Sequence, residues 1–407
     1  MSVDEAAGVS LAERPASVAI KGGKPRLRLV DADAHIDPPY EMWKEYLPAN
    51  LREHAPYIEE GEEHDWIVFE GRRRPMKMIG NQAGRSGKDF KMQGKRSEMR
   101  AAWIAEQRLA DMDQDGMDAA VLFGGGPLGT TNSELYVASF ETYNRWVWDW
   151  SSADRKRLVP VAYLPMRDID ETIGLLRQAA GLGFRSANIP AFPQAPSGFS
   201  TSSMVKAIEQ GKGAALTGDP TGGRQYSDPD FDRLWAEFSD LDMTITIHLG
   251  GRIPRFGEKD HFLPDMVMSK LAMAEPIGVL IFSGVFQRFP KLRFATVESG
   301  VGWFAFAAEY MDRTWEKQRF WTESKLTEKP SFYMDRNVFG SFINDRVGIL
   351  NRGEPGGRNI MWSSDYPHSE TTFPHSLEVI ARDFAGVPEA DVREIVCDRA
   401  RRVYAVD

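Results

Sequence analysis

Short apolar segments alternate with longer amphipathic segments along most of this chain, and this alternation leaves few folds open. The short segments have the length of buried strands, and most of the longer ones repeat apolar residues at helical spacing. Eight strands are predicted, at residues 29–36, 119–123, 158–164, 184–190, 243–249, 292–298, 337–343 and 359–364. Repeated strand–helix units imply a parallel sheet. Eight such units predict a closed (β/α)8 TIM barrel of the α/β class.

An open, doubly wound sheet is the alternative fold. Its dinucleotide-binding form carries a G-x-G-x-x-G motif directly after the first strand. Here the sequence Asp-Ala-Asp-Ala-His occupies that place, at residues 31–35. A Gly-Gly-Gly-Pro run at residues 124–127 is interpreted as a plain turn. The barrel is therefore the preferred prediction.

The segments outside the alternating pattern are predicted to be a leader and several insertions. Residues 1–25 lack the apolar stretch of a secretory signal and are predicted to be a loosely ordered leader, ahead of one domain at 26–407. A long insertion without a repeated strand pattern, 38–100, follows the first strand, and smaller ones follow the fourth strand, 192–227, and the fifth, 250–266. Loops of this length often cover active sites, so 38–100 and 192–227 are predicted to be lid-like.

The composition narrows the classes of partner. Lys plus Arg number 50 and Asp plus Glu number 59, a net charge of -9 that argues against a nucleic-acid binder. The single cysteine, Cys397, excludes an internal disulfide and suits the reducing cytoplasm. The sequence contains no run of 18 apolar residues, so no membrane helix is predicted. A cytoplasmic protein that acts on a small molecule is expected.

Three ionisable residues recur at every second position of the first predicted strand. Side chains alternate between the two faces of a strand, so Asp31, Asp33 and His35 share one face. Burying two carboxylates beside an imidazole is costly unless something compensates the charge, and a divalent cation does so. An exposed edge strand with one polar face is the alternative interpretation.

Three further strands end in residues that bind metals. His248, Glu298 and Asp365 each follow an apolar strand and precede a turn signal. Singly, they could be a core histidine, a helix cap and a turn residue. Together they would meet Asp33 and His35 at the carboxyl end of a parallel barrel. Nitrogen and oxygen ligands without thiolates suit Zn²⁺, Mn²⁺, Fe²⁺ or Co²⁺. One ion is expected, with zinc preferred.

Three other residues are candidates for substrate contacts or proton transfer. His368 lies three residues after Asp365 and is either a proton-transfer group or a loop histidine. Arg252, after the fifth strand, could bind an anionic substrate, although solvated loop charges are the usual case. Trp303 is assigned to substrate binding, with packing beneath the mouth as the alternative.

The chain from residue 31 to 404 resembles the amidohydrolase-related family of metal-dependent TIM barrels. The closest branch includes the aminocarboxymuconate-semialdehyde and resorcylate decarboxylases. The matching stretches are 31–36, 108–118, 144–146, 247–250, 286–294, 298–303 and 363–368. The resemblance implies a metal held by Asp33, His35, His248 and Asp365, and it implies a homodimer, the common state of the relatives.

Two departures from the family pattern guide the expected activity. Asp33 stands where the family usually has His or Glu, and Glu298 stands where the well-studied decarboxylases have a histidine. A carboxylate could bind a second metal or act as a base, so hydrolysis of an amide, ester, lactone or thioester by metal-activated water is predicted. Asp365 would move the proton, and the metal with His248 or a loop donor would polarise the substrate carbonyl. Decarboxylation of an aromatic or unsaturated carboxylic acid is the alternative. A hydratase and a non-enzymatic scaffold rank below it.

Overall fold

The computed structural model describes residues 27–85, 87–101, 103–193, 225–249 and 262–407, and its eight predicted strand segments all form strands. The third segment is interrupted at Val161 and therefore forms two short strands, which carry separate labels. The barrel strands are β1 (Val30–Ile36), β5 (Ala119–Gly124), β6 (Leu158–Pro160), β7 (Ala162–Tyr163), β8 (Ser186–Asn188), β9 (Thr244–His248), β10 (Phe294–Val297), β11 (Val338–Phe342) and β12 (Ile360–Trp362). All neighbouring pairs among them are parallel.

Backbone hydrogen bonds join the two ends of this sheet. The strands pair in the orders β1-β5-β6 and β12-β11-β10-β9-β8-β7, and β6 continues into β7. The His35 N–H donates to the Tyr366 carbonyl at 2.6 Å, and the Asp365 N–H donates to the Asp33 carbonyl at 3.0 Å. The chain just after β12 therefore lies against β1, and the predicted (β/α)8 TIM barrel is confirmed.

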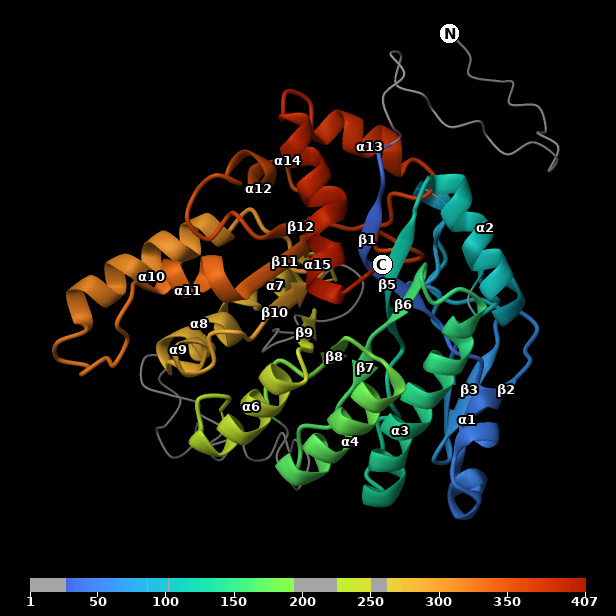
Figure 1. The fold of residues 1–407 in the computed structure, drawn as a ribbon. Coiled ribbons are helices and arrows are strands. Elements are labelled where there is room, and N and C mark those ends of the chain that lie inside the picture. The colour runs from blue at the N-terminus through green and yellow to red at the C-terminus, as the bar shows by residue number, and fades with distance from the viewer. Residues whose placement is uncertain (1–26, 86, 102, 194–224, 250–261) are drawn as a thin grey trace, which may run out of the picture.

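Helices surround the strands (Figure 1). Around the first half lie α2 (Ala105–Asp115), α3 (Ser133–Trp150), α4 (Ile169–Leu182) and α6 (Asp232–Asp240). Around the second half and at the C-terminus lie α7 (Phe262–Leu271), α8 (Ala274–Phe282), α9 (Val285–Arg288), α10 (Phe304–Gln318), α11 (Pro330–Asn337), α12 (Arg346–Leu350), α13 (Ser376–Asp383), α14 (Glu389–Arg393) and α15 (Arg399–Tyr404). No helix in the described part of the chain has both the length and the apolarity needed to cross a membrane.

Local signals set the helix ends. The Asn132 side chain accepts hydrogen bonds from the first free N–H groups of α3, those of Glu134 and Leu135, both at 3.1 Å. Helix α2 ends at Gly116, whose φ of 80° lies in the left-handed region that glycine adopts without strain.

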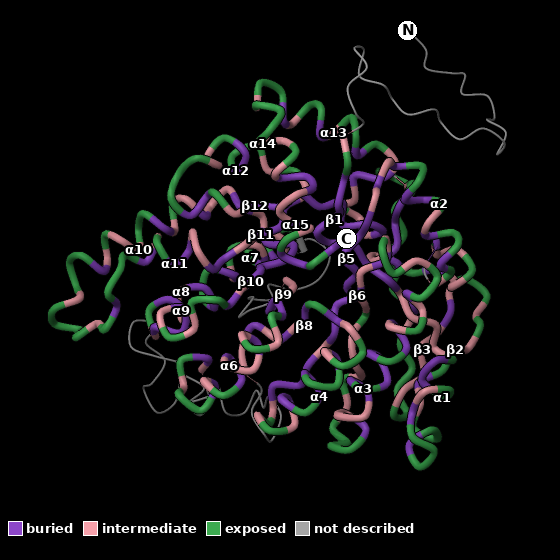
Figure 2. The backbone as a smooth tube through the Cα atoms, in the orientation of Figure 1, coloured by how far each residue is buried: buried purple, intermediate pink, exposed green. Residues whose placement is uncertain are grey.

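The core lies within and around the strands, which are the most buried part of the backbone (Figure 2). A parallel strand covered by helices on its outer face is apolar along its length, which explains the continuous apolar runs in β5 and β9. The C-terminal helix α15 contacts β1 and β12, and its Val403 carbonyl accepts a hydrogen bond from Thr244 at the start of β9. The C-terminal segment thus packs at the amino end of the strands and leaves their carboxyl end to the insertions.

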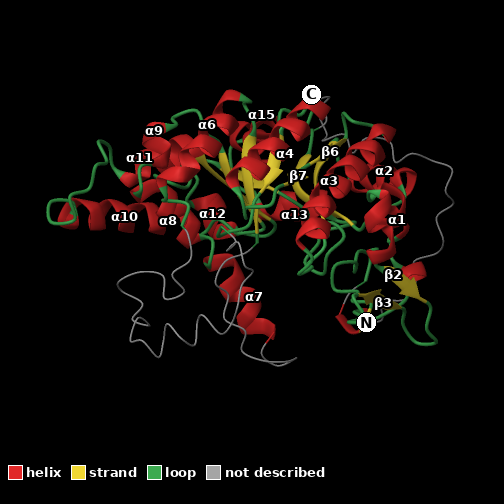
Figure 3. Ribbon diagram, turned by 90° about the horizontal axis from the view of Figure 1, so that it is seen from below, coloured by secondary structure: helices red, strands yellow, loops and turns green. Residues whose placement is uncertain are grey.

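The insertion after β1 contains a small sheet that the sequence did not reveal. It holds α1 (Glu41–Tyr46) and the antiparallel strands β2 (Tyr57–Glu59), β3 (Trp66–Phe69) and β4 (Arg72–Pro75). These strands have three or four residues each and are at least partly exposed; only β3 is apolar, and β4 carries three arginines, so no repeated strand pattern appears. In Figure 3 this sheet and α7 project on the same side of the barrel. The lid-like role of 38–100 stays a prediction, and most of 192–227 falls outside the described residues.

Candidate metal centre

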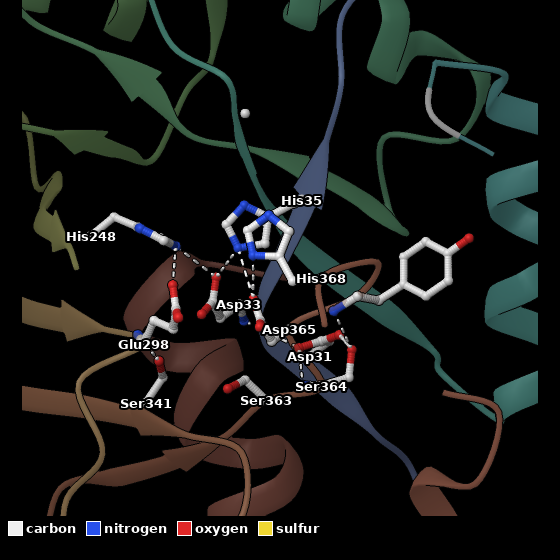
Figure 4. A network of polar contacts seen from close by, with 12 residues as sticks. Asp31, Asp33, His35, His248, Glu298, Ser341, Ser363, Ser364, Asp365 and His368 are labelled. Atoms are coloured by element: carbon white, nitrogen blue, oxygen red, sulfur yellow. Dashed lines mark hydrogen bonds and ion pairs between the residues drawn. The ribbon is translucent and has the colours of Figure 1, made fainter. Parts of the chain in front are cut away.

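Strand β1 directs its ionisable face into the barrel. Asp31, Asp33 and His35 are all buried, with Asp33 fully shielded from solvent. Figure 4 shows His248, Glu298 and Asp365 converging on them from the ends of three other strands. The structure therefore brings together every metal-ligand candidate that the sequence predicted.

The side-chain atoms of this cluster lie close enough to share one ion. His248 Nε2 lies 3.2 Å from Asp33 Oδ1 and 3.8 Å from Glu298 Oε2. His35 Nε2 lies 3.4 Å from Asp33 Oδ1 and 3.0 Å from Asp365 Oδ1. Two overlapping sets of four residues each have ligand atoms within 4.8 Å of one another: Asp33, His35, His248 and Glu298, and His35, Glu298, Asp365 and His368.

His368 joins the cluster from the loop after β12. Its Nδ1 lies 3.0 Å from Asp365 Oδ1, and its ring stacks on that of His35 with centroids 3.6 Å apart. Asp365 is buried, whereas 28% of the His368 side chain is exposed. His368 thus links the buried carboxylate to solvent, and its role in proton transfer stays a prediction.

The donor set fits a divalent cation. Asp33 Oδ2 and Asp365 Oδ2 are buried and have no hydrogen-bond partner among the described residues. His35 Nε2 and Asp365 Oδ1 lie 3.0 Å apart but lack the geometry of a hydrogen bond. Buried polar atoms without partners are costly, and a cluster of several is explained most simply by an ion that they coordinate. Carboxylate and imidazole ligands are those that Zn²⁺ and Mn²⁺ accept.

The pKa values reflect the crowding of charge. Burial lowers the pKa of His35 to about 4, and the nearby His368 adds to the effect, which leaves His35 as a neutral imidazole. Burial also disfavours a charged His368, but the Asp365 carboxylate outweighs it and raises the pKa of His368 to about 9. Burial and the charge of Asp365 together raise the pKa of Glu298 to about 6.

The backbone at two of the strand ends is held in an unusual conformation. Glu298 and Asp365 both have φ of 56°, in the left-handed region that few residues other than glycine adopt. Such conformations persist where the surrounding structure enforces them, and they concentrate at functional sites. Each turn aims its carboxylate at the cluster. The Glu298 N–H is fixed by Ser341 Oγ at 3.0 Å.

Asp31 has a different environment from its neighbours on β1. Its Oδ1 accepts hydrogen bonds from the Ser364 N–H at 2.8 Å and the Asp33 N–H at 3.2 Å, and its Oδ2 accepts one from the Ser364 hydroxyl. With both oxygens engaged, Asp31 joins β1 to the end of β12. Burial nevertheless raises the pKa of Asp31 to about 7.

We expect Ser364→Ala to destabilise the fold by about 1–3 kcal/mol, because it leaves one buried oxygen of Asp31 without a partner. Urea denaturation would measure the change. Ser363→Ala is the matched control. The Ser363 hydroxyl donates to the Phe342 carbonyl, which also accepts from the Ser363 N–H and so keeps a partner. Equal losses in the two variants would contradict the assigned role of Asp31.

Several residues that support the site gave no signal that the sequence analysis used. The Asn188 side-chain oxygen accepts from the His248 N–H at 3.0 Å, and Arg108 donates to the His35 carbonyl at 3.0 Å. Lys270 of α7 donates to Glu298 Oε1 at 2.8 Å and to Glu370 Oε2 at 3.0 Å. Asn188 ends β8, so the rule of polar strand ends could have found it. A single helical lysine carries no such signal.

Of the two residues predicted to contact the substrate, the structure describes only Trp303. Trp303 precedes α10, donates from Nε1 to the Ser299 carbonyl at 3.1 Å, and lines a cavity of about 540 Å³ together with Lys270 and Glu298. Trp303 thus faces a hollow that opens beside the cluster. Arg252 lies outside the described residues.

The chain was compared with known proteins. A family profile described as "Amidohydrolase" matches residues 30–406. No sequence among the curated proteins matches the chain. An amidohydrolase structure from Mycobacterium avium subsp. paratuberculosis K-10 is similar, with a TM-score of 0.70, 17% identity, and coverage of 94% of this chain and 100% of that one.

Two decarboxylase structures share the fold. The 5-carboxyvanillate decarboxylase from Sphingomonas paucimobilis has a TM-score of 0.60 and 18% identity, with 94% of this chain and 100% of that chain covered. A dihydroxybenzoic acid decarboxylase from Polaromonas sp. JS666, with bound manganese and the inhibitor 2-nitroresorcinol, has a TM-score of 0.60 and 16% identity, with 93% and 97% covered. The barrel and the profile match over almost all of the described fold show that the chain is a member of the amidohydrolase family.

Proposed function

We propose that this protein is a metal-dependent decarboxylase that releases CO₂ from an aromatic or unsaturated carboxylic acid. The observation that carries the proposal is the contact between a partly exposed histidine, His368, and a buried carboxylate, Asp365, beside a cluster that fits a cation. Decarboxylation needs a cation that holds the substrate carboxylate, and the cluster would bind that cation. It also needs a route that brings a proton from solvent to carbon, and the contact between His368 and Asp365 would provide that route.

Asp33, His35, His248 and Asp365 would hold one divalent ion. Such an ion supplies a positive charge that binds the substrate carboxylate and polarises a neighbouring oxygen. One oxygen of Glu298 is engaged by Lys270, which favours a single ion over two. The ligand chemistry suits zinc, as the sequence predicted, and equally manganese, which the structure from Polaromonas sp. JS666 contains.

The residues of the chain would move the proton. The bond between the substrate carbon and its carboxylate breaks, the electron pair stays on carbon, and that carbon takes a proton as CO₂ leaves. Asp365 lies within the cluster and is placed to pass this proton. His368, charged at neutral pH by its contact with Asp365, would replace the proton from solvent.

Hydrolysis remains the second candidate, because one observation favours it. Glu298 places a carboxylate oxygen 3.8 Å from His248 Nε2, where it could act as a base toward a water molecule. The solved relatives named as decarboxylases support the first candidate.

One experiment separates the two reactions. The metal-loaded enzyme is incubated in H₂¹⁸O with a panel of hydroxylated benzoic acids and a panel of aryl esters and lactones. Release of CO₂ from the acids, without incorporation of ¹⁸O, would support decarboxylation. Incorporation of ¹⁸O into the acid product of an ester or lactone, with no CO₂ released, would show hydrolysis instead.

We expect His368→Gln to lower kcat by roughly 10²-fold with little change in bound metal, because glutamine keeps a hydrogen-bonding side chain but cannot carry the proton. Steady-state kinetics and elemental analysis would measure the two quantities. His375→Gln is the matched control, since His375 lies in the following loop with 66% of its side chain exposed. Unchanged kcat in His368→Gln would remove this histidine from the proposed route.

A further inference from the structure

The cavity beside the cluster has a distribution of charge that selects among carboxylic acids. Its volume is about 540 Å³, within the range of small-molecule sites, and its inner end is formed by Lys270 and Glu298. Glu298 belongs to the cluster as well, so the cavity borders the cluster at this residue. Leu271, Trp303 and Phe342 give it an apolar wall.

Carboxylates outnumber cations among the residues that line this cavity. Its charged lining residues are Lys270, Glu298, Asp345 and Glu370, one cation against three carboxylates. The Asp345 carboxylate accepts from the N–H groups of Val301 at 2.7 Å and Gly302 at 2.6 Å, which hold it in place. Besides Glu298, the body of a molecule bound in this cavity therefore meets two carboxylates, Asp345 and Glu370, and a single lysine.

Lys270 has one donor left for a ligand. An ammonium group has three N–H donors. Two of them go to Glu298 and Glu370, at 2.8 and 3.0 Å, and no third acceptor lies within reach among the described residues. The lysine charge is shared between two carboxylates, so a further anion gains little attraction there. A neutral oxygen, such as that of an amide, hydroxyl or ether, fits the remaining donor.

We propose that this cavity binds the uncharged body of a monocarboxylic aromatic acid and rejects a second carboxylate, with Glu370 as the residue that determines this specificity. The inference rests on the proposed function in one respect, since it takes the cluster as the place of the reacting carboxylate. Lys270 donates to a neutral acceptor on the ring. Glu370 repels a negative group at the same place. It also pairs with the Lys270 ammonium, which would otherwise bind that group.

Matched pairs of ligands test the proposal. Benzoates with a carbamoyl group at the meta or para position have nearly the same shape as the corresponding dicarboxylates and differ by one charge. Calorimetric titration of the metal-loaded enzyme is expected to show the carbamoyl benzoates binding roughly five- to tenfold more tightly than the dicarboxylates. In Glu370→Gln the preference is expected to fall below roughly twofold, because Lys270 becomes free to pair with the second carboxylate. Glu378→Gln, which removes a carboxylate that is 81% exposed on α13, is expected to keep the preference of the parent enzyme.

A second pair of variants locates the binding. Val347 lines the cavity from α12, and Leu350 lies on the same helix but is not among the lining residues. Val347→Trp is expected to weaken binding of every ligand by roughly tenfold by filling the cavity, whereas Leu350→Trp is expected to change it less than twofold. Equal effects of the two substitutions would place the binding elsewhere and overturn the proposal.

The remaining outcomes separate the inference from the proposed reaction. Dicarboxylates that bind as tightly as the carbamoyl benzoates, a preference unaffected by Glu370→Gln, or no binding by any member of the panel would overturn the inference. A preference that follows Glu370 without release of CO₂ from any panel member would support the inference and count against decarboxylation. Release of CO₂ from dicarboxylates and carbamoyl benzoates alike, with equal affinities, would support the reaction and overturn the inference.

Discussion

Replacing Asp365 by asparagine is expected to lower kcat by roughly 10²- to 10⁴-fold, the range seen when a proton-transferring group is lost. The side chain keeps its size, and asparagine accepts the left-handed backbone conformation that Asp365 adopts, at φ of 56°. The turn should therefore form as before. What disappears is a carboxylate that faces His35 at 3.0 Å and His368 at 3.0 Å.

Two measurements make the result of Asp365→Asn decisive. Circular dichroism and thermal unfolding should show the native fold, and elemental analysis should report whether the ion is retained. Asp240→Asn is a suitable control because it removes an exposed carboxylate at the end of α6 that does not belong to the cluster. Near-normal turnover in Asp365→Asn would exclude this residue from the chemistry under either candidate reaction.

Removal of bound cations with a chelator is expected to abolish turnover and to lower Tm by several degrees. The physical reason is the set of buried oxygens on Asp33 and Asp365 that have no hydrogen-bond partner among the described residues. A cation at 100 times its Kd stabilises a protein by about 2.7 kcal/mol. Adding back Zn²⁺ or Mn²⁺ should restore both activity and Tm, and differential scanning calorimetry with an assay would follow the two.

A double variant provides the control for this experiment. His35→Gln with His248→Gln removes two of the four proposed ligands, so its Tm should no longer respond to chelator or metal. His54→Gln alters a histidine with 47% of its side chain exposed in the insertion, and its response should match the parent enzyme. A parent enzyme that contains no metal and keeps its Tm in chelator would contradict the proposed ion site.

The sequence predicted the barrel because its strands are buried on both faces. Strand β5 is apolar and β9 alternates threonine with isoleucine; both are buried and followed by a turn signal, so their positions could be found without long-range information. The same rule located His248, Glu298 and Asp365, since each is the first ionisable residue at or after the end of a buried strand. These are local patterns that the topology then brings together.

Features that depend on tertiary contacts could not be predicted in this way. One strand of the small sheet after β1, β4, carries three consecutive arginines, and it pairs with β3 although it has no apolar face of its own. The alternation of β1 placed Asp31 with Asp33 but could not show that Ser364, 333 residues away, engages its oxygens. Lys270 gave no signal because its role comes only from the carboxylates it meets.

The contact between Asp31 and Ser364 also bears on how the protein is made. Synthesis proceeds from the N-terminus, so β1 leaves the ribosome long before the segment that completes the barrel. Asp33 and Asp365 meet only after that segment has paired with β1, and pairing across such a sequence separation is slow. The nascent chain therefore lacks the complete ligand set until the segment around Asp365 has been made and has paired with β1. The proposed ion site is completed by one of the last pairings within the barrel.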